Sequence, residues 1–465
     1  MSCRGQRRSV AAPARSWSGR GRRAHTGRRR TPRPASLAIG RGGLMMIVAC
    51  VALAAGAHAQ EAPTPGPRRG LQKTVDEKTR IEVFRGRSGS FTRLPPRAER
   101  SPEERGQHLA RLRAAYTRSP AEWPAPQVDP GVAWRELGLL PTPPQVERGS
   151  VEDTRIQLGK RLFFDPQLSS SGQIACASCH DPDLSWGDGR TVSFGHGRTP
   201  LKRNAPSLLN VGQADRLFWD GRARSLEQQV ELVMLNPNEM HASEEETVRR
   251  LRSVPGYVQA FAAAYPGRPI SLATLATAIA EFERSLVGGR SRFDIFLKGR
   301  PEVLSDDALV GLDLFRTDAR CMNCHHGPTL SDNRLHDVGL SYYGRKFQDL
   351  GAFEQTRRIE DVGRFKTPSL RNVTRSGPWM HNGLFTSLDG VLNMYNAGMP
   401  HLYPKNAEQL DDPFFPHKSK HLRPLGLNKQ DKADLIAFLE SLAEPPRRVR
   451  PPEPFPQAAS VADQR

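Results

Sequence analysis

At 465 residues the chain is long enough for more than one hydrophobic core, and two domains are the default expectation. Its formal net charge of +19 is mostly an N-terminal feature, because residues 1–60 hold 12 of the 68 Lys and Arg residues and no Asp or Glu. The rest of the chain has 56 basic and 49 acidic residues, a net charge of only +7. A nucleic-acid-binding protein is therefore not indicated.

The N-terminal segment has the features of an export signal. An apolar stretch over residues 44–55 follows the basic Arg41 and ends near Ala57-His58-Ala59, an A-x-A cleavage pattern. The stretch is too short for a comfortable transmembrane span. We therefore expect residues 1–59 to be a basic extension plus signal peptide, and the mature protein to be periplasmic.

Two alternatives remain at this end of the chain. Residues 47–50 can also be interpreted as a lipoprotein box, and translation could begin at Met45 or Met46; the mature protein is exported in either case. Cys3 and Cys50 belong to the segment that is removed, which leaves four cysteines. In an oxidising compartment four cysteines normally suggest two disulfides, so their spacing decides their role.

In chain order, the predicted elements are almost all helical. Residues 60–130 are rich in Pro, Arg and Glu and indicate an extension or linker with one helix, Ser101–Tyr116. No stretch alternates for long as a strand would, and the Pro-rich residues 446–465 indicate a disordered tail. Further helices are expected over residues 154–164, 272–286, 306–315 and 387–397 and after Asn428.

An internal repeat occupies residues 131–445. The segment Pro206–Val211 recurs as Pro368–Val373, and the register holds from there to Leu226 and Leu388. A Cys-x-x-Cys-His motif precedes each copy, and an amphipathic helix follows it. Self-similarity of this kind indicates two related units, which we place at residues 131–290 and 291–445.

Cys-x-x-Cys-His motifs are typical of covalent haem attachment. Two thiols add to the vinyl groups of one porphyrin, and the histidine that follows binds the iron as proximal ligand. A zinc site would need further Cys or His at ligand spacing, and a redox Cys-x-x-Cys pair explains neither the histidine nor the duplication. The residues are Cys176, Cys179 and His180 in the first motif and Cys321, Cys324 and His325 in the second.

The repeat and the motifs together predict a mainly α fold of two tandem cytochrome c-like domains, related by internal duplication and carrying two covalently bound haem c groups. The two units differ at the sixth iron ligand. Helical periodicity over 387–397 places Tyr395 on the apolar face and turns Met394 about 100° away, which favours Tyr395 as the ligand of the second haem, although a core tyrosine and Met394 remain alternatives. The equivalent residue in the first unit is Val233, which cannot bind iron. The first haem is then open to peroxide or held by a loop group.

These residues resemble the bacterial di-haem cytochrome c peroxidases and their MauG-like relatives over about residues 130–445. The family's Phe-Trp-Asp-Gly-Arg-Ala element stands at Phe218–Ala223. The resemblance implies that Trp219 relays electrons between the haems, and that Gln229 and Glu239 form a polar pair above the first haem. A carboxylate there can take a proton from peroxide and return it to the leaving oxygen, while an amide can orient the peroxide. Without the resemblance, Glu239 fits a solvated charge and Trp219 fits core packing.

The resemblance also implies further ligands and partners. His196 would ligate the first haem at rest and swing away on activation, which its flanking glycines permit, although a lone loop histidine is commonly exposed. Asn204, with the carbonyls of Ser376 and Pro378, would hold a calcium ion. The expected partners are hydrogen peroxide and either a redox protein (a small cytochrome c or a copper protein) or a protein substrate, and a homodimer is common in the group.

Two residues depart from the family pattern. Val233 stands where the family usually has proline, and Tyr395 stands where the electron-accepting peroxidases have methionine. A phenolate favours ferric and higher states of iron, whereas a thioether favours ferrous iron. The sequence therefore predicts a peroxidase of the MauG-like branch, which reacts with hydrogen peroxide at the N-terminal haem and draws electrons through the C-terminal haem. The alternative is a non-enzymatic di-haem electron-transfer cytochrome.

Overall fold

The computed structural model of the chain describes residues 94–446 and 448–456. The basic extension, the apolar stretch and the start of the 60–130 segment lie outside these residues, so export stays a prediction. Within the described ranges, no helix is both long enough and apolar enough to cross a membrane.

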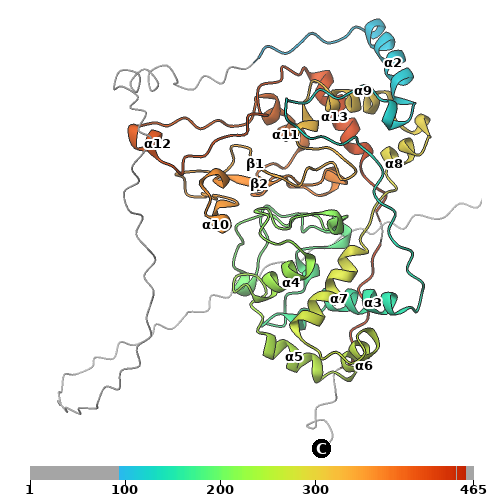
Figure 1. Cartoon of the computed structure of the whole chain (residues 1–465), viewed down its shortest axis with the longest axis vertical. Coiled ribbons are helices and arrows are strands. Elements are labelled where there is room, and N and C mark those ends of the chain that lie inside the picture. The colour runs from blue at the N-terminus through green and yellow to red at the C-terminus, as the bar shows by residue number, and fades with distance from the viewer. Residues whose placement is uncertain (1–93, 447, 457–465) are drawn as a thin grey trace, which may run out of the picture. The chain divides into compact units, whose positions relative to one another are not determined.

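The described chain is helix-rich, as predicted, and Figure 1 shows its helices in chain order. The strands β1 (Leu335–Asp337) and β2 (Arg364–Lys366) form a small antiparallel pair with Leu335 opposite Lys366. We call residues 151–290 the first half and residues 291–446 the second half. The first half contains α3 (Val151–Phe163), α4 (Leu226–Leu235), α5 (Glu244–Arg252), α6 (Pro255–Ala264) and α7 (Leu272–Arg284). The second half contains α8 (Arg292–Leu297), α9 (Asp306–Arg316), α10 (Phe353–Thr356), α11 (Leu388–Asn396), α12 (Ala407–Asp411) and α13 (Lys429–Ser441), and α2 (Pro102–Tyr116) precedes both halves.

Polar side chains set where the main helices begin. The Ser150 hydroxyl accepts a hydrogen bond from the backbone N–H of Asp153, so α3 begins three residues before the predicted start. Ser271 caps α7 in the same way, and Asn428 caps α13 as predicted. The helical periodicity located the apolar faces correctly, while the caps decided the ends.

Each half contains a pair of helices that meet at a glycine. In the first half α3 packs against α7, and a Cβ atom added at Gly159 would lie 1.8 Å from the carbonyl oxygen of Ala278. In the second half α9 packs against α13, and a Cβ atom added at Gly311 would lie 2.0 Å from the carbonyl oxygen of Asp434. In Figure 1, α3 lies beside α7, and α9 lies beside α13. The same close approach thus occurs once in each half.

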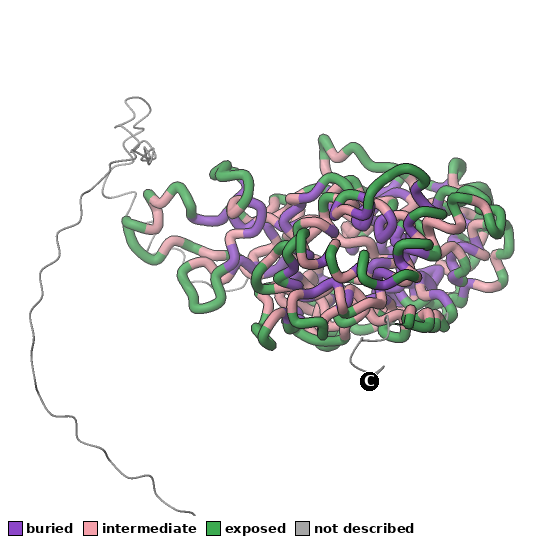
Figure 2. Tube along the Cα trace, turned by 90° about the horizontal axis from the view of Figure 1, so that it is seen from below, coloured by how far each residue is buried: buried purple, intermediate pink, exposed green. Residues whose placement is uncertain are grey.

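The apolar side chains of the two halves form separate cores. Buried stretches lie in the interior of the described chain and exposed ones around its outside, as Figure 2 shows. The core of the second half also takes up Leu112, Tyr116, Trp123 and Leu137, which precede the first half in sequence. The prediction assigned residues from 131 onward to the first half, but Leu137 packs in the second.

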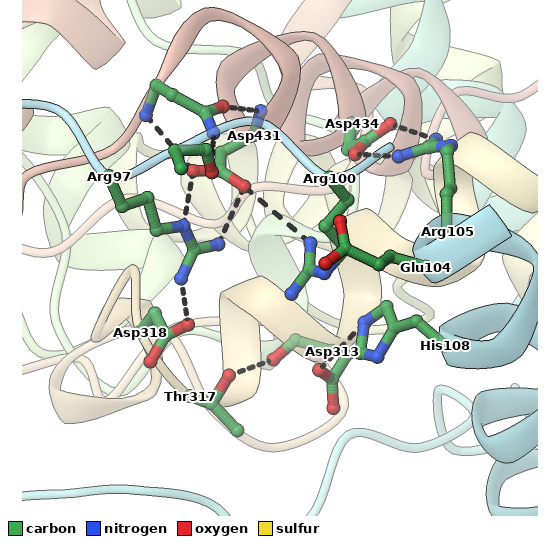
Figure 3. Close-up of polar contacts among 12 residues, drawn as sticks. Arg97, Arg100, Glu104, Arg105, His108, Asp313, Thr317, Asp318, Asp431 and Asp434 are labelled. Atoms are coloured by element: carbon green, nitrogen blue, oxygen red, sulfur yellow. Dashed lines mark hydrogen bonds and ion pairs between the residues drawn. The ribbon is translucent and has the colours of Figure 1, made fainter. Parts of the chain in front are cut away.

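The described part of the predicted linker is an arm, residues 94–130, that docks on the second half. Its arginines pair with two carboxylates at the start of α13: Arg97 contacts Asp431 at 2.6 Å, and Arg105 contacts Asp434 at 2.7 Å (Figure 3). The side chains of Asp431 and Asp434 are almost completely buried, and a buried carboxylate is costly unless it is paired. The arm is therefore an integral part of the second half.

The described part of the predicted disordered tail also packs against the protein. The ring of Phe455 lies edge-on to Tyr257, with 5.0 Å between the ring centroids, and the guanidinium of Arg161 lies 4.0 Å from its centre. Val449 joins Phe455 against the core of the first half. Residues 448–456 thus return the chain to the first half, which the Pro-rich composition did not predict.

Candidate haem sites

A cavity of about 890 Å³ includes both Cys-x-x-Cys-His motifs in its lining. Its walls come from both halves, and apolar atoms make up most of their surface. This is the usual lining of a site for an organic cofactor. The lining includes Cys176, Cys179 and His180 from the first half and Cys321, Cys324 and His325 from the second.

Both motifs fold into one turn of 3-10 helix, Cys176–Ser178 and Cys321–Asn323. The backbone N–H of each motif histidine donates to the carbonyl oxygen of the first cysteine, at 3.0 Å in the first motif and 2.8 Å in the second. The four motif cysteines form no disulfides. Burial raises the pKa of the Cys179 thiol to about 11 and that of Cys321 to about 12. Two buried thiols followed directly by a histidine on one turn are the arrangement that covalent attachment of a porphyrin requires.

The two motif histidines are oriented as metal ligands. Nδ1 of His180 donates to the backbone oxygen of Trp186, and Nδ1 of His325 donates to that of Leu330, both at 2.9 Å. This bond fixes the tautomer and leaves Nε2 with a free lone pair. Burial also lowers the pKa of both rings, that of His325 to about 4, so both are neutral at pH 7. The residues present therefore fit two c-type haems.

The zinc alternative finds little support. Within residues 94–446 and 448–456, the group of side chains close enough to hold a metal is Cys324, Asp332 and His336. It contains one cysteine of the second motif and none of the first. Asp332 and His336 are also bonded to each other, at 2.8 Å. A repeated zinc site would require matching ligands at both motifs.

The predicted polar pair of the first half lies in the cavity wall. Gln229 and Val233 are one turn apart on α4, and both line the cavity together with Glu239. The amide of Asn236 donates to Oε1 of Glu239 at 3.0 Å. Burial raises the pKa of Glu239, although the positive charge of Arg222 opposes this shift. Glu239 is thus a partly buried acid whose proton affinity exceeds that of an ordinary glutamate.

Trp219 lies where the two halves meet. Its indole N–H donates to the backbone oxygen of Asn204 at 2.9 Å, and its own carbonyl oxygen accepts from the backbone N–H of Lys366 at 2.6 Å. Its ring lies 6.4 Å from that of His381, which stacks on Phe365 with 3.6 Å between centroids. An aromatic path therefore leads from the first half into the second.

The contact between the halves is made by equivalent atoms. The spacing of 162 residues from Pro206 to Pro368 relates Asn204 to Lys366 and Trp219 to His381. The backbone N–H of Asn204 donates to the carbonyl oxygen of His381 at 2.7 Å, and that of Lys366 donates to the carbonyl oxygen of Trp219 at 2.6 Å. The same hydrogen bond is made twice, once in each direction.

In the second half the lining matches the helical periodicity. Tyr395 lines the cavity with other residues of α11, whereas Met394 is not part of the lining. Burial, and then the nearby thiols of Cys324 and Cys321, raise the pKa of the Tyr395 phenol well above its usual value. The structure thus places Tyr395 near the second motif.

Of the other predicted ligands, those for calcium lie in the cavity wall, whereas His196 does not. The ring of His196 packs against His241, with 4.6 Å between centroids, and its Nδ1 lies 3.3 Å from the Ser170 hydroxyl, outside the cavity lining. The predicted calcium ligands Asn204, Ser376 and Pro378 all line the cavity. The amide nitrogen of Asn204 donates to the carbonyl oxygen of Arg190 at 2.7 Å, so its amide oxygen is the atom that calcium would take.

Several cavity residues were missed by sequence reasoning. Arg203 forms a two-pronged ion pair with Asp349 at 2.7 and 2.8 Å and contacts Asp220 at 2.6 Å. Lys366 and His381 line the cavity as well. The 162-residue register pairs Lys366 with Asn204 and His381 with Trp219, both of which are predicted site residues, so the signal was present in the repeat.

Comparison with known proteins agrees with this site. Residues 153–302 match the family model described as di-haem cytochrome c peroxidase. The chain is 36% identical over 350 residues to the methylamine utilization protein MauG of Methylorubrum extorquens, covering 75% of this chain and 88% of that protein. It is 34% identical over 322 residues to the cytochrome c551 peroxidase of Pseudomonas aeruginosa, covering 67% of this chain and 86% of that protein. A crystal structure of a MauG-like protein associated with microbial copper homeostasis is similar at 32% identity with a TM-score of 0.56, covering 67% of this chain and 94% of that one.

A helix-rich chain with two haem-attachment motifs around one cavity defines a di-haem c-type cytochrome. The chain belongs to the di-haem cytochrome c peroxidase family, which includes MauG. It is accordingly an oxidoreductase that acts on peroxide, and its family implies two c-type haems.

Proposed function

We propose that the chain is a periplasmic peroxidase of the MauG-like branch, built from two cytochrome c-like domains related by duplication. Hydrogen peroxide reacts in the first half, and electrons are drawn through the second half. One observation carries the proposal. The same helical position holds Val233 beside Glu239 and Gln229 in the first half but Tyr395 in the second, and all four line the cavity. A peroxide molecule therefore has room and an acid–base group on one side only.

Each half would hold one of the two haems through its own motif. His180 would hold the iron of the first haem and His325 that of the second, with the motif cysteines attached to each porphyrin. When bound, haem supplies an iron that can take up an oxygen ligand and exchange electrons.

The side chains of the first half handle the proton. Glu239 takes a proton from peroxide and returns it to the leaving oxygen, a transfer that its raised pKa favours. Gln229, on the same wall, donates a hydrogen bond that orients the peroxide. Trp219 couples the first half to the second through its ring contact with His381.

Tyr395 supports the MauG-like branch. A buried phenol with a raised pKa ionises only when a cation compensates the charge of the phenolate, and a ferric iron is such a cation. A phenolate ligand stabilises oxidised iron, in contrast to a thioether. The second half would then withdraw electrons from a substrate protein or a small redox protein (a cytochrome c or a copper protein).

The proposal also includes a calcium ion, a second position of His196, export and a homodimer. A calcium ion bound by Asn204 and the carbonyls of Ser376 and Pro378 would join the two halves at the cavity, since Asn204 comes from the first and the others from the second. His196 would reach the first iron only after leaving its contact with His241. Export to the periplasm rests on residues 1–59, and a homodimer rests on the resemblance alone.

The experiment that tests the proposal is haem analysis of the exported protein followed by mixing with hydrogen peroxide. We expect two haem c groups per chain by pyridine haemochrome, one in a variant with Cys176→Ser and Cys179→Ser, and a rapid spectral change on adding peroxide. A chain with two haems whose spectra do not respond to peroxide, even after partial reduction, would instead be an electron carrier. A chain without covalent haem would contradict both functions.

Tyr395→Phe should change the spectrum of the second haem. Removing the phenol oxygen removes the proposed sixth ligand, so the electronic spectrum and the EPR signal of the second haem shift while those of the first stay the same. Met394→Leu is the matched control on the adjacent position of α11 and should leave both haems unaltered. An unaltered spectrum in Tyr395→Phe together with a shifted one in Met394→Leu would assign the ligand to methionine and remove the case for the MauG-like branch.

A further inference from the structure

A buried glutamate that the proposed reaction does not use lies beside the first haem-attachment motif. Glu283 is on α7, is only 3% exposed, and lines the cavity together with Cys176. Burial, and then the negative charge of Glu283, raise the pKa of the Cys176 thiol, so the two side chains interact. The Oε2 atom of Glu283 is buried and has no hydrogen-bond partner among the described residues. An unsatisfied carboxyl oxygen in such a place is costly and calls for a reason.

The positive charge that acts on Glu283, that of Arg284, is already paired with another acid. Helix α3 packs against α7 through apolar side chains such as Leu162. The charged neighbours are Arg284, the next residue along the chain, and Glu227 on α4, and these two pair with each other at 2.6 Å in partly exposed positions. Burial accordingly raises the pKa of Glu283 to about 8. A nearby positive charge would lower that value and produce the carboxylate.

The second half shows that the fold does not require this acid. The glycine contacts match Ala278 of α7 with Asp434 of α13. Five residues further along the two helices, the equivalents are Glu283 and Leu439, and both line the cavity. A leucine thus fills the place of the glutamate at the second site. At this position of the two helices, the first half has an acid and the second half has a leucine.

We propose that Glu283 couples a proton to the electron taken up by the first haem. The inference rests on the proposed attachment of haem at Cys176 and goes beyond the roles of Glu239 and Gln229. Ferric haem has one more positive charge than ferrous haem and therefore favours the Glu283 carboxylate. When the iron gains one electron, Glu283 gains one proton from solvent and forms an O–H bond; oxidation reverses both transfers. Reduction of peroxide to two waters consumes two electrons and two protons. With this coupling, the first half would hold one of those protons together with one of those electrons.

The test is a redox titration of the holoprotein at several pH values, with each haem followed in its visible spectrum. In the wild type, the midpoint potential of the first haem should fall as pH rises, by up to about 59 mV per tenfold change in proton concentration for one proton per electron. Glu283→Gln should remove most of this slope, because the amide cannot take up a proton. Glu281→Gln, on the same helix but absent from the cavity lining, is the charge-matched control and should retain the slope.

A second variant and an infrared measurement test the same role of Glu283. Glu283→Leu introduces the residue that α13 has at this place, which gives a second variant compatible with the fold. In the infrared difference spectrum between the reduced and oxidised proteins, a protonated carboxyl band should be present in the wild type and absent from both Glu283 variants. A first haem whose potential does not vary with pH, or a slope and band that persist in both variants, would overturn the proposal. Absence of covalent haem at Cys176 would instead refute the proposed function.

Discussion

Replacing Glu239 by glutamine should slow the reaction with hydrogen peroxide by about 10²- to 10⁴-fold, the range expected for loss of a positioned acid–base group. Glutamine keeps the size and the contact with Asn236 but cannot accept the peroxide proton. The rate should be measured by stopped-flow mixing of the fully oxidised protein with peroxide. The haem content and both haem potentials should stay close to those of the wild type.

The pH dependence of the same reaction supplies an internal check. Glu239 acts as a base in its ionised form, so the wild-type rate should rise with pH as the carboxyl loses its proton. Burial raises its pKa, so this rise should occur at a higher pH than for an ordinary glutamate. The glutamine variant should lose the rise. Glu231→Gln, on α4 but outside the cavity lining, should behave as the wild type. A Glu239→Gln protein that reacts at the wild-type rate would show that another group moves the proton.

Replacing Glu136 by glutamine should destabilise the protein by about 3–5 kcal/mol, the cost of leaving a buried charge unpaired. The side chain of Arg316 is fully buried, and its guanidinium lies 5.3 Å from the ring centroids of both Tyr116 and Trp123. Its Nη1 atom donates to the Tyr116 hydroxyl at 3.0 Å, and its charge is paired with Glu136. Glutamine keeps one acceptor oxygen but removes the negative charge.

Chemical denaturation of the holoprotein would measure this loss, with the visible spectrum reporting each haem and circular dichroism reporting the helices. Glu360→Gln removes a carboxylate from a solvent-exposed pair with Arg358 and should leave the midpoint unchanged. Arg316 ends α9 in the second half, and Tyr116, which precedes the first half in sequence, packs in the core of the second. The variant should therefore loosen the second half first. Equal stability of the two variants would mean that water or another group compensates Arg316.

Local patterns in the sequence were sufficient to predict the two haem motifs and the helices α2, α3, α7, α9, α11 and α13, whereas α4, α5, α6, α8, α10 and α12 were not predicted. Helical spacing alone predicted that Tyr395, rather than Met394, faces the site of the second motif, because a shift of one residue turns a side chain by about 100°. Tyr395 does line the cavity, and Met394 does not. The histidine of each motif needed no tertiary information, since the motif folds into a single turn. The same periodicity could also have revealed Glu283, which lies one turn after Ile279 on the buried stripe of α7.

Contacts between distant parts of the chain could not be predicted in this way. The pair formed by Arg97 and Asp431 joins residues 334 positions apart, and nothing in the composition of the Pro-rich segment indicates its partner. The position of His196 was also beyond reach, because its contact with His241 depends on how two loops fold together. Pattern reasoning identifies what a segment forms but not where it docks.

The reciprocal hydrogen bonds between the two halves have a consequence for how the site could diverge. In a symmetric dimer of identical chains, any change at such an interface is imposed on both sides at once. Here the matching positions belong to one polypeptide, so each can change without its counterpart. A tryptophan therefore faces a histidine, and an asparagine occupies the place that a lysine occupies opposite, while the backbone pairing that holds the halves together is the same for both.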